Sequence, residues 1–244
     1  MMRALHDAGR TIIPAHEDPD GPLPGLLVML TVVTGLIDAF SFLDLGRVFV
    51  ANMTGNIVFL SFDLGGAPGF VWWASVLAIV TFLLGAFAGG RVGRTYGHHR
   101  GLHLLVAATL QVTVVVAAFI IALAVDRPYR DGVLAILVIL LGLGMGLQNA
   151  TARSLAVPDL TTTVLTLTLT GISSDRAAKG RSEGRLGRRA VSIASMFVGG
   201  LVGAALIESR HPAWTLLIAT FLLGAVAAGS FRTLRSAEKW TNRR

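Results

Sequence analysis

The sequence predicts an all-α integral membrane protein with six transmembrane helices in two inverted three-helix repeats, each carrying a short re-entrant or broken helix. Three observations predict this fold class. Hydrophobic residues make up 53% of the chain and charged residues 14%, where a soluble domain carries roughly 25% charged residues. Six long apolar segments accompany two short ones that polar residues interrupt. Polar and small-residue motifs of the first half also recur in the second.

The long segments can each cross a bilayer, because a helix rises about 1.5 Å per residue and the hydrocarbon core is about 30 Å thick. They are residues 26–44, 70–90, 102–125, 132–152, 190–207 and 213–231. We assign residues 26–231 to a single transmembrane domain, with one repeat at 26–125 and the other at 132–231.

The two ends of the chain are polar. Residues 1–25 contain four prolines and no apolar core, so they predict a disordered tail and no cleavable signal peptide. Residues 232–244 form a basic tail. We expect both tails to be cytoplasmic.

The two short segments, 48–64 and 160–172, decide the threading. If both enter and leave on one face, 17 basic residues lie on the side of the tails and 4 on the other. Such a split agrees with the excess of Lys and Arg in cytoplasmic loops. The charges therefore favour six crossings with two re-entrant segments. They predict a multi-pass protein with both termini cytoplasmic.

An internal repeat relates the two halves. The matches pair residues 35–39 with 146–150, 52–56 with 159–163, and 89–93 with 199–203. Since each half holds an odd number of crossings, the second half is expected to be inverted relative to the first. Glycines spaced four residues apart, at 85, 89 and 93 and at 142 and 146, predict closely packed helix faces.

Asp38 lies near the middle of the first predicted span. An ionised carboxylate at that depth costs at least about 2.5–3.5 kcal/mol, so the side chain should face the protein interior. It is either a coupling carboxylate or ligand contact, or it makes a structural hydrogen bond to Asn149 or to the broken backbone. The sequence leaves both interpretations open.

Polar residues mark the start of each short helix. Asn52, Thr54, Gly55 and Asn56 precede the first, since Asn and Thr cap helices and Gly lets a ligand approach the backbone. Free N–H groups at a helix start suit an anion or a carbonyl. The same residues also satisfy the backbone of a broken helix in lipid, so capping and substrate contact are both consistent with the pattern.

We expect the polar residues of both halves to line one shared central site. The candidate substrate-binding residues are Asp38, Asn52, Thr54, Gly55, Asn56, Gln148, Asn149, Asp159, Thr161 and Thr162.

Several functional classes have no support in the sequence. The chain has no cysteine, which excludes disulfides and thiolate chemistry. It has no HExxH, G-x-S-x-G or Walker motif, so we expect neither an enzyme nor a bound cofactor or metal. The net charge of +7 is explained by the cytoplasmic excess of basic residues, so we expect no nucleic-acid partner.

The stretch 35–56, GLIDAFSFLDLGRVFVANMTGN, resembles the YoaK-type family of bacterial inner-membrane proteins, a domain-of-unknown-function family. The resembling pattern is Gly and Asp in the first helix, followed by Gly-x-x-Phe-x-(Ala/Ser)-Asn-x-Thr-Gly-Asn. Here these residues are Gly35, Asp38, Gly46, Phe49, Ala51, Asn52, Thr54, Gly55 and Asn56. Thr163 stands where a second Thr-Gly would be expected. The resemblance implies a multi-pass membrane protein and names no substrate.

The functional hypothesis is a secondary transporter for a small polar or anionic solute, with proton coupling through Asp38. The alternative is a non-transporting membrane scaffold or lipid-binding protein whose polar breaks are structural. The expected partners are the lipid bilayer and a small-molecule solute. With six crossings a homodimer is compatible with the sequence, which leaves the oligomeric state open.

Overall fold

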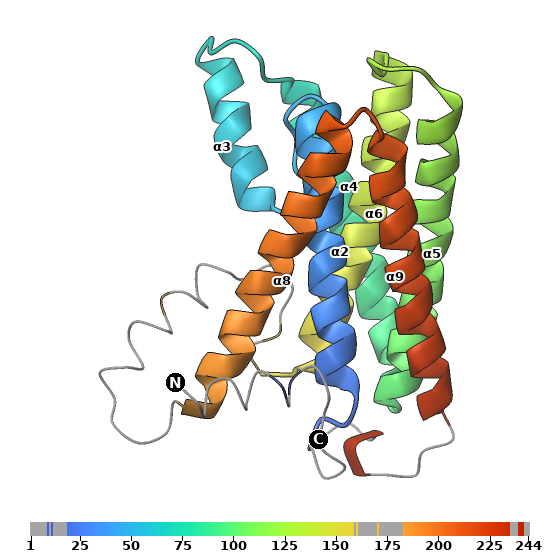
Figure 1. The fold of residues 1–244 in the computed structure, drawn as a ribbon. Helices are drawn as coiled ribbons and strands as arrows, with labels where there is room; N and C mark the ends of the chain where they lie inside the picture. The colour runs from blue at the N-terminus through green and yellow to red at the C-terminus, as the bar shows by residue number, and fades with distance from the viewer. Residues whose placement is uncertain are drawn as a thin grey trace.

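The structure is a computed structural model, and it describes residues 9, 11, 19–158, 160, 170, 183–234 and 239–241. This part of the chain is all-helical (Figure 1). Its helices are α2 (Leu23–Asp44), α3 (Met53–Leu64), α4 (Trp72–Tyr96), α5 (Arg100–Ala124), α6 (Asp131–Leu155), α8 (Glu183–Glu208), α9 (Pro212–Thr233) and the 3-10 turn η1 (Lys239–Thr241). Six of them are long and apolar enough to span a membrane, which confirms the predicted number of crossings.

The helices generally extend past the predicted apolar segments. α2 begins at Leu23 because Pro24 is tolerated in a first helical turn, and His99 caps α5 by accepting a hydrogen bond from Leu102 N at 3.1 Å. α4 continues to Tyr96 and α6 to Leu155. The extra turns are polar, so hydrophobicity alone identifies the part of each helix that lies in the hydrocarbon core and does not predict where the helix ends.

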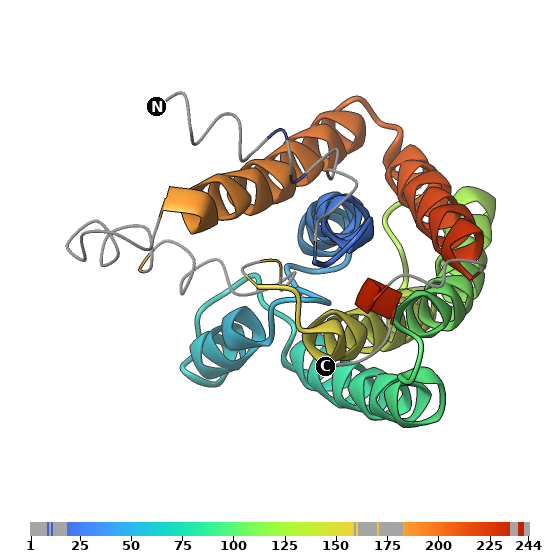
Figure 2. The same ribbon diagram turned by 90° about the horizontal axis from the view of Figure 1, so that it is seen from below.

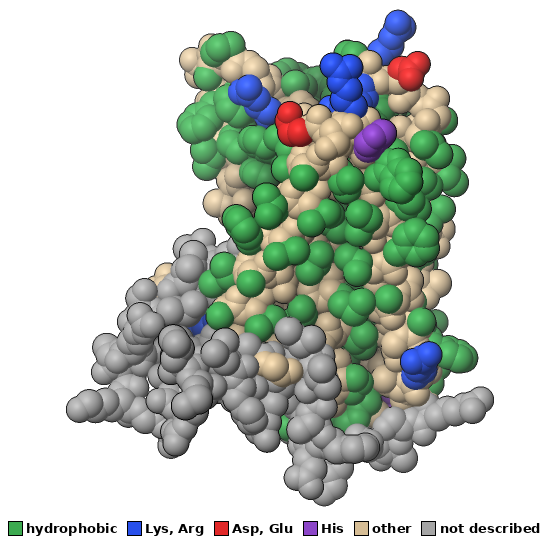
Figure 3. All heavy atoms as spheres, viewed as in Figure 1, with side chains coloured by type: hydrophobic (Ala, Val, Ile, Leu, Met, Phe, Trp, Pro, Cys, Tyr) green, Lys and Arg blue, Asp and Glu red, His purple; other side chains and the backbone are tan. Residues whose placement is uncertain are grey.

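Charged side chains gather at the two ends of the bundle. Figure 3 shows a broad band of apolar and small side chains between them. We call the end where α2 begins the Asp20 end and the end where α2 finishes the Asp44 end. Arg100 at the start of α5 and Arg188 in the first turns of α8 both contact Asp20, and Arg100 also bonds the last residue of α6, Leu155.

The short helix α3 does not cross the bundle. α2 finishes and α4 begins at the Asp44 end, and α3 runs between them at the periphery (Figures 1 and 2). Residues 45–71 therefore leave and return on one face, as predicted. Since α6 ends and α8 begins at the Asp20 end, the chain between them also returns to the face it left. The second predicted short helix, 160–172, lies outside the described residues except for Leu160 and Thr170.

Two helix pairs form the closest contacts of the bundle: α2 with α8, and α4 with α6 (Figure 1). A methyl group at Gly35 or Gly199 would overlap backbone of the partner helix, at Met196 O and Val32 O respectively. The glycines of α4 and α6 are equally confined. Gly146 faces Phe82 O and Gly85 faces Leu143 O. Glycine is required in both pairs because the backbones touch, which confirms the predicted packing faces.

Equivalent positions can be read from these contacts. Gly35 and Gly146 play matching parts, in agreement with the sequence repeat. On the partner helices, however, Gly85 matches Gly199 and Gly89 matches Gly203, since Gly89 meets Leu147 O and Gly203 meets Leu36 O. The contacts thus favour a register one helical turn away from the pairing of 89–93 with 199–203.

Candidate functional site

The chain reverses direction after α2. Gly46 has a φ of 82°, a left-handed conformation that glycine adopts without strain, and the next residues run back along α2. Asp38 binds this reversed segment, because its Oδ1 accepts hydrogen bonds from Ala51 N at 2.9 Å and Val50 N at 3.3 Å. Asp38 lies six residues before the end of α2, so the reversed segment reaches about 9 Å below the Asp44 end. The bond to the broken backbone, one of the two predicted roles of Asp38, is present.

Two asparagines then start α3. Asn52 is the N-cap, and its side chain accepts from Gly55 N at 3.4 Å. Asn56 is fully buried and bonds Phe49 in both directions, accepting from Phe49 N at 2.9 Å and donating to Phe49 O at 2.6 Å. Asn56 therefore fixes the reversed segment to the helix, which is a structural role.

The remaining residues of the motif divide between the interior and the surface. A methyl group at Gly55 would stand 2.8 Å from the Phe49 ring, so this glycine makes room for a side chain. Thr54 is exposed. Phe49 stacks on Phe42 with ring centroids 4.8 Å apart. Of the motif, Asp38 and Asn52 are the polar residues that face a common space.

That space is a cleft of about 380 Å³ between α2, α8 and the reversed segment. Its walls are otherwise apolar, and they comprise Gly35, Ala39, Phe42, Leu43, Phe49, Met196, Gly200 and Ala204. Asp38 is 5% exposed. Within the described part of the chain, its Oδ2 has no hydrogen-bond partner. The cleft thus combines an apolar, aromatic lining with the Asp38 carboxylate and the Asn52 amide, which is the usual composition of a small-molecule site.

Gln148 lies elsewhere, in a closed polar chain through the bundle core. Its Oε1 accepts from Gln111 Nε2 at 2.7 Å, and its Nε2 donates to Thr34 Oγ1 at 2.8 Å and Leu30 O at 3.2 Å. Asn149 is half-buried and donates to Met145 O of its own helix at 2.9 Å. Neither residue lines the cleft. Asp159, Thr161 and Thr162 lie outside the described residues, so the shared central site stays a prediction.

Sequence reasoning missed several residues of these sites. The α8 wall of the cleft, at Met196, Gly200 and Ala204, carries no polar signal. Gln111 does carry one, because it is an isolated amide in the apolar run 102–125. An amide in that position predicts an interhelical hydrogen bond, and the Gln148 contact is such a bond.

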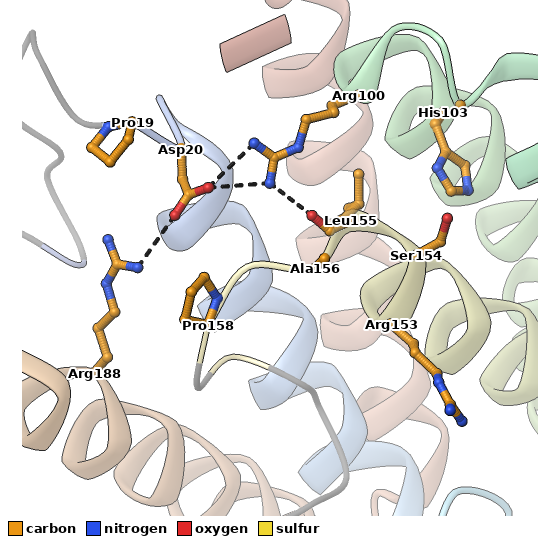
Figure 4. A pocket seen from close by; sticks show the side chains of 11 residues that line it. Pro19, Asp20, Arg100, His103, Arg153, Ser154, Leu155, Ala156, Pro158 and Arg188 are labelled. Atoms are coloured by element: carbon orange, nitrogen blue, oxygen red, sulfur yellow. Dashed lines mark hydrogen bonds and ion pairs between the residues drawn. The ribbon is translucent and has the colours of Figure 1, made fainter. Parts of the chain in front are cut away.

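At the Asp20 end, a second cavity of about 490 Å³ is lined mostly by polar and basic residues (Figure 4). Asp20 joins two helices here, since its carboxylate pairs with Arg100 at 3.2 Å and Arg188 at 3.3 Å. Arg100 is largely buried and also donates to Leu155 O at 2.7 Å. Asp20 falls in the predicted tail, and Arg188 in the predicted basic loop 174–189, whose end the structure shows as part of α8. The ion pairs between them had no sequence signal.

At the Asp44 end, Asp44 pairs with Arg127 of the loop between α5 and α6. Tyr129 of the same loop donates to Ala122 O at 3.3 Å. Burial, with a further contribution from the Asp44 carboxylate, raises the pKa of Tyr129 to about 12. The hydroxyl group therefore stays protonated and keeps this hydrogen bond.

Comparisons with known proteins agree with the fold. The chain is 33% identical over 152 residues to the "UPF0700 transmembrane protein YoaK" of Bacillus subtilis (strain 168). The aligned stretch covers 62% of this chain and 65% of that relative, slightly less than two thirds of each. No solved structure matches. Residues 26–229 match the family described as "Protein of unknown function (DUF1275)". The match spans nearly the whole transmembrane region, so the chain belongs to this family of YoaK-type membrane proteins.

Proposed function

We propose that this protein is a secondary transporter for a small polar solute, coupled to protons through Asp38. The observation that carries the proposal is the open carboxylate oxygen of Asp38 in a cleft beside a broken helix. Discontinuous helices near mid-membrane form the substrate and ion sites of many transporters. An anionic solute, which the sequence also allows, would need Asp38 to be protonated while the anion is bound.

The helix contacts support an alternating-access mechanism. Matching glycines hold α2 to α8 and α4 to α6, as expected if the halves are inverted copies that exchange helices across the centre. In that arrangement one half rocks against the other around the cleft. Asp38 then either carries a proton or contacts the solute, and the rocking motion exposes the site to the other face.

We further propose that the Asp20 end is cytoplasmic, in a bacterial inner membrane. Arg91, Arg94 and Arg232 join Arg100 and Arg188 at this end, in line with the positive-inside rule. The chain lacks cysteine, so single cysteines report sidedness directly. A membrane-impermeant maleimide should label Ala67→Cys and not Thr95→Cys when added to cells whose outer membrane is permeable to it. The reverse pattern would refute this orientation.

Transport is tested with purified protein in liposomes that contain a pH-sensitive dye. Small anions, amino acids, nucleobases and amines are added outside, one at a time. We expect at least one solute to change the internal pH with wild type and not with Asp38→Asn, while Asp63→Asn, an acid near the end of α3, behaves like wild type. An equal response in wild type and Asp38→Asn would refute coupling through Asp38.

One observation favours a second candidate, a lipid-binding protein that transports nothing. The cavity at the Asp20 end is lined by Arg100, Arg153 and Arg188 and by Asp20, a basic surface at the depth of headgroups. This candidate predicts stabilisation by anionic lipid that Arg153→Gln weakens, with no solute-driven pH change for any member of the panel.

A further inference from the structure

The cleft also indicates the class of solute. Among the residues that line it in the described part of the chain, Asp38 is the one ionisable side chain, and no Lys, Arg or His is present. The Asp38 carboxylate is stabilised by two N–H groups and by the nearby start of α3, yet it keeps a full negative charge when deprotonated. A ligand beside Oδ2 therefore meets a carboxylate oxygen that no cationic side chain of the described lining balances.

Apart from the Asn52 amide, the rest of the described lining is apolar and aromatic. Phe42 and Phe49 are stacked rings on one side, and Met196, Gly200 and Ala204 form the α8 side. Aromatic faces attract cations, above all where water is excluded, and methionine adapts to ligands of varied shape. A volume of about 380 Å³ accommodates a small organic molecule and exceeds what a bare metal ion needs.

We propose that the solute is a small organic cation, an amine or quaternary ammonium with an apolar body. Its charged nitrogen lies against Asp38 Oδ2 and its apolar part lies between the phenylalanine rings and α8. The cation and a proton then compete for one carboxylate. This inference rests on the proposed transport function for its physiological meaning, but cation binding can be measured without transport.

The competition is confined to Asp38 because the other charged groups of the surrounding helices stand at the ends of the bundle. At the Asp44 end these are Asp44 of α2, Asp63 of α3 and Glu208 of α8. At the Asp20 end they are Arg153 of α6, Arg188 and Arg189 of α8, and Arg232 of α9.

The test uses thermal unfolding of the detergent-purified full chain with three probes of similar shape. Phenyltrimethylammonium is the cation, tert-butylbenzene its neutral isostere and benzenesulfonate an anion. Each shift in Tm is compared with the shift in Asp38→Asn, which keeps an oxygen for Val50 N and Ala51 N. Effects that arise from the detergent are equal in both proteins and cancel.

We expect the cation to raise the Tm of wild type and of Asp63→Asn, and not that of Asp38→Asn. Ala204→Phe, which fills the cleft from the α8 side, should also abolish the shift. Where Asp38 is mostly protonated, the apparent Kd of the cation should rise about tenfold for each unit by which the pH is lowered, because the proton competes for the same carboxylate. Tetramethylammonium, which lacks the ring, should bind more weakly.

Three results would overturn the inference. They are a shift with tert-butylbenzene or benzenesulfonate as large as that with the cation, a cation shift that survives in Asp38→Asn, and no shift with either ammonium probe. Cation binding without solute-driven proton movement in liposomes would leave this inference standing and refute the transport proposal. Proton movement driven only by another solute class would support the transport proposal and refute the inference that the solute is an organic cation.

Discussion

The α2–α8 pair and the α4–α6 pair are built alike but carry different polar groups. In both pairs a glycine of the enclosed helix, Gly35 or Gly146, touches the backbone of its partner. Three residues later α2 has Asp38, and α6 has Asn149. Asp38 faces a cleft with one oxygen open, whereas Asn149 bonds its own helix and the adjacent Gln148 is closed within the core.

The difference shows how a shared scaffold can serve stability on one side and chemistry on the other. Gln148 uses both ends of its amide for contacts with α5 and α2, so no group is left for a ligand. Asp38 uses one oxygen to hold the broken backbone and leaves the other toward the cleft. A buried polar residue becomes a candidate site when its partners do not saturate it.

The largest expected effects come from breaking the scaffold that both pairs share. Leucine at Gly35 or Gly146 would overlap partner backbone, so each variant should lose at least about 3 kcal/mol of stability or fail to fold. Gly90→Leu is the matched control, since a methyl group there meets nothing within 4 Å. Yield and monodispersity after size-exclusion chromatography provide the readout. Equal yields of all three would contradict the packing described here.

Asp38→Ala separates the two roles of the α2 carboxylate. Without an acceptor, Val50 N and Ala51 N lose their partner, at about 1–3 kcal/mol for each unsatisfied group. We expect unfolding in denaturant to show a loss of about 2 kcal/mol or more for Asp38→Ala and much less for Asp38→Asn. If the two variants were equally stable, the hydrogen bonds to the reversed segment would not hold it.

Gln148→Leu should cost less than Asp38→Ala. Interhelical hydrogen bonds in membrane proteins average about 0.6 kcal/mol, with a maximum near 1.7, and Thr34 keeps its bond to Leu30 O. Gln111→Leu should cost a similar amount, and the double variant less than the sum, because both remove the same contact. Strict additivity in this double-mutant cycle would argue against the Gln111–Gln148 bond.

The smallest expected effect is at the start of α3. Asn52→Ala removes the cap on Gly55 N and should cost about 1 kcal/mol or less, because N-caps contribute about 0.5–2 kcal/mol. Faster hydrogen exchange in the first turn of α3 is the readout. Thr54→Ala, at an exposed side chain, should change little, and equal effects at both positions would refute the capping role.

The parts predicted well from sequence are those in which a local rule acts alone. Apolar length predicts six spans, and Asn52 marks the start of α3. On α4 and α8 the sequence pairs glycines that lie one helical turn away from those that the contacts make equivalent. Glycines recur every four residues there, so a sequence match can be shifted by one turn. The α8 wall of the cleft and the ion pairs of Asp20 depend on tertiary contacts. Small residues and isolated charged residues carry no sequence pattern from which such contacts can be predicted.

Proton release on cation binding tests the central claim most directly, namely that the open Asp38 carboxylate exchanges a proton for the solute. Phenyltrimethylammonium is added to purified protein in weakly buffered solution while pH is recorded over a range of starting values. We predict release that approaches one proton per bound probe when Asp38 begins protonated, and none with Asp38→Asn. Binding without release at every starting pH, or equal release from Asp38→Asn, would contradict the claim.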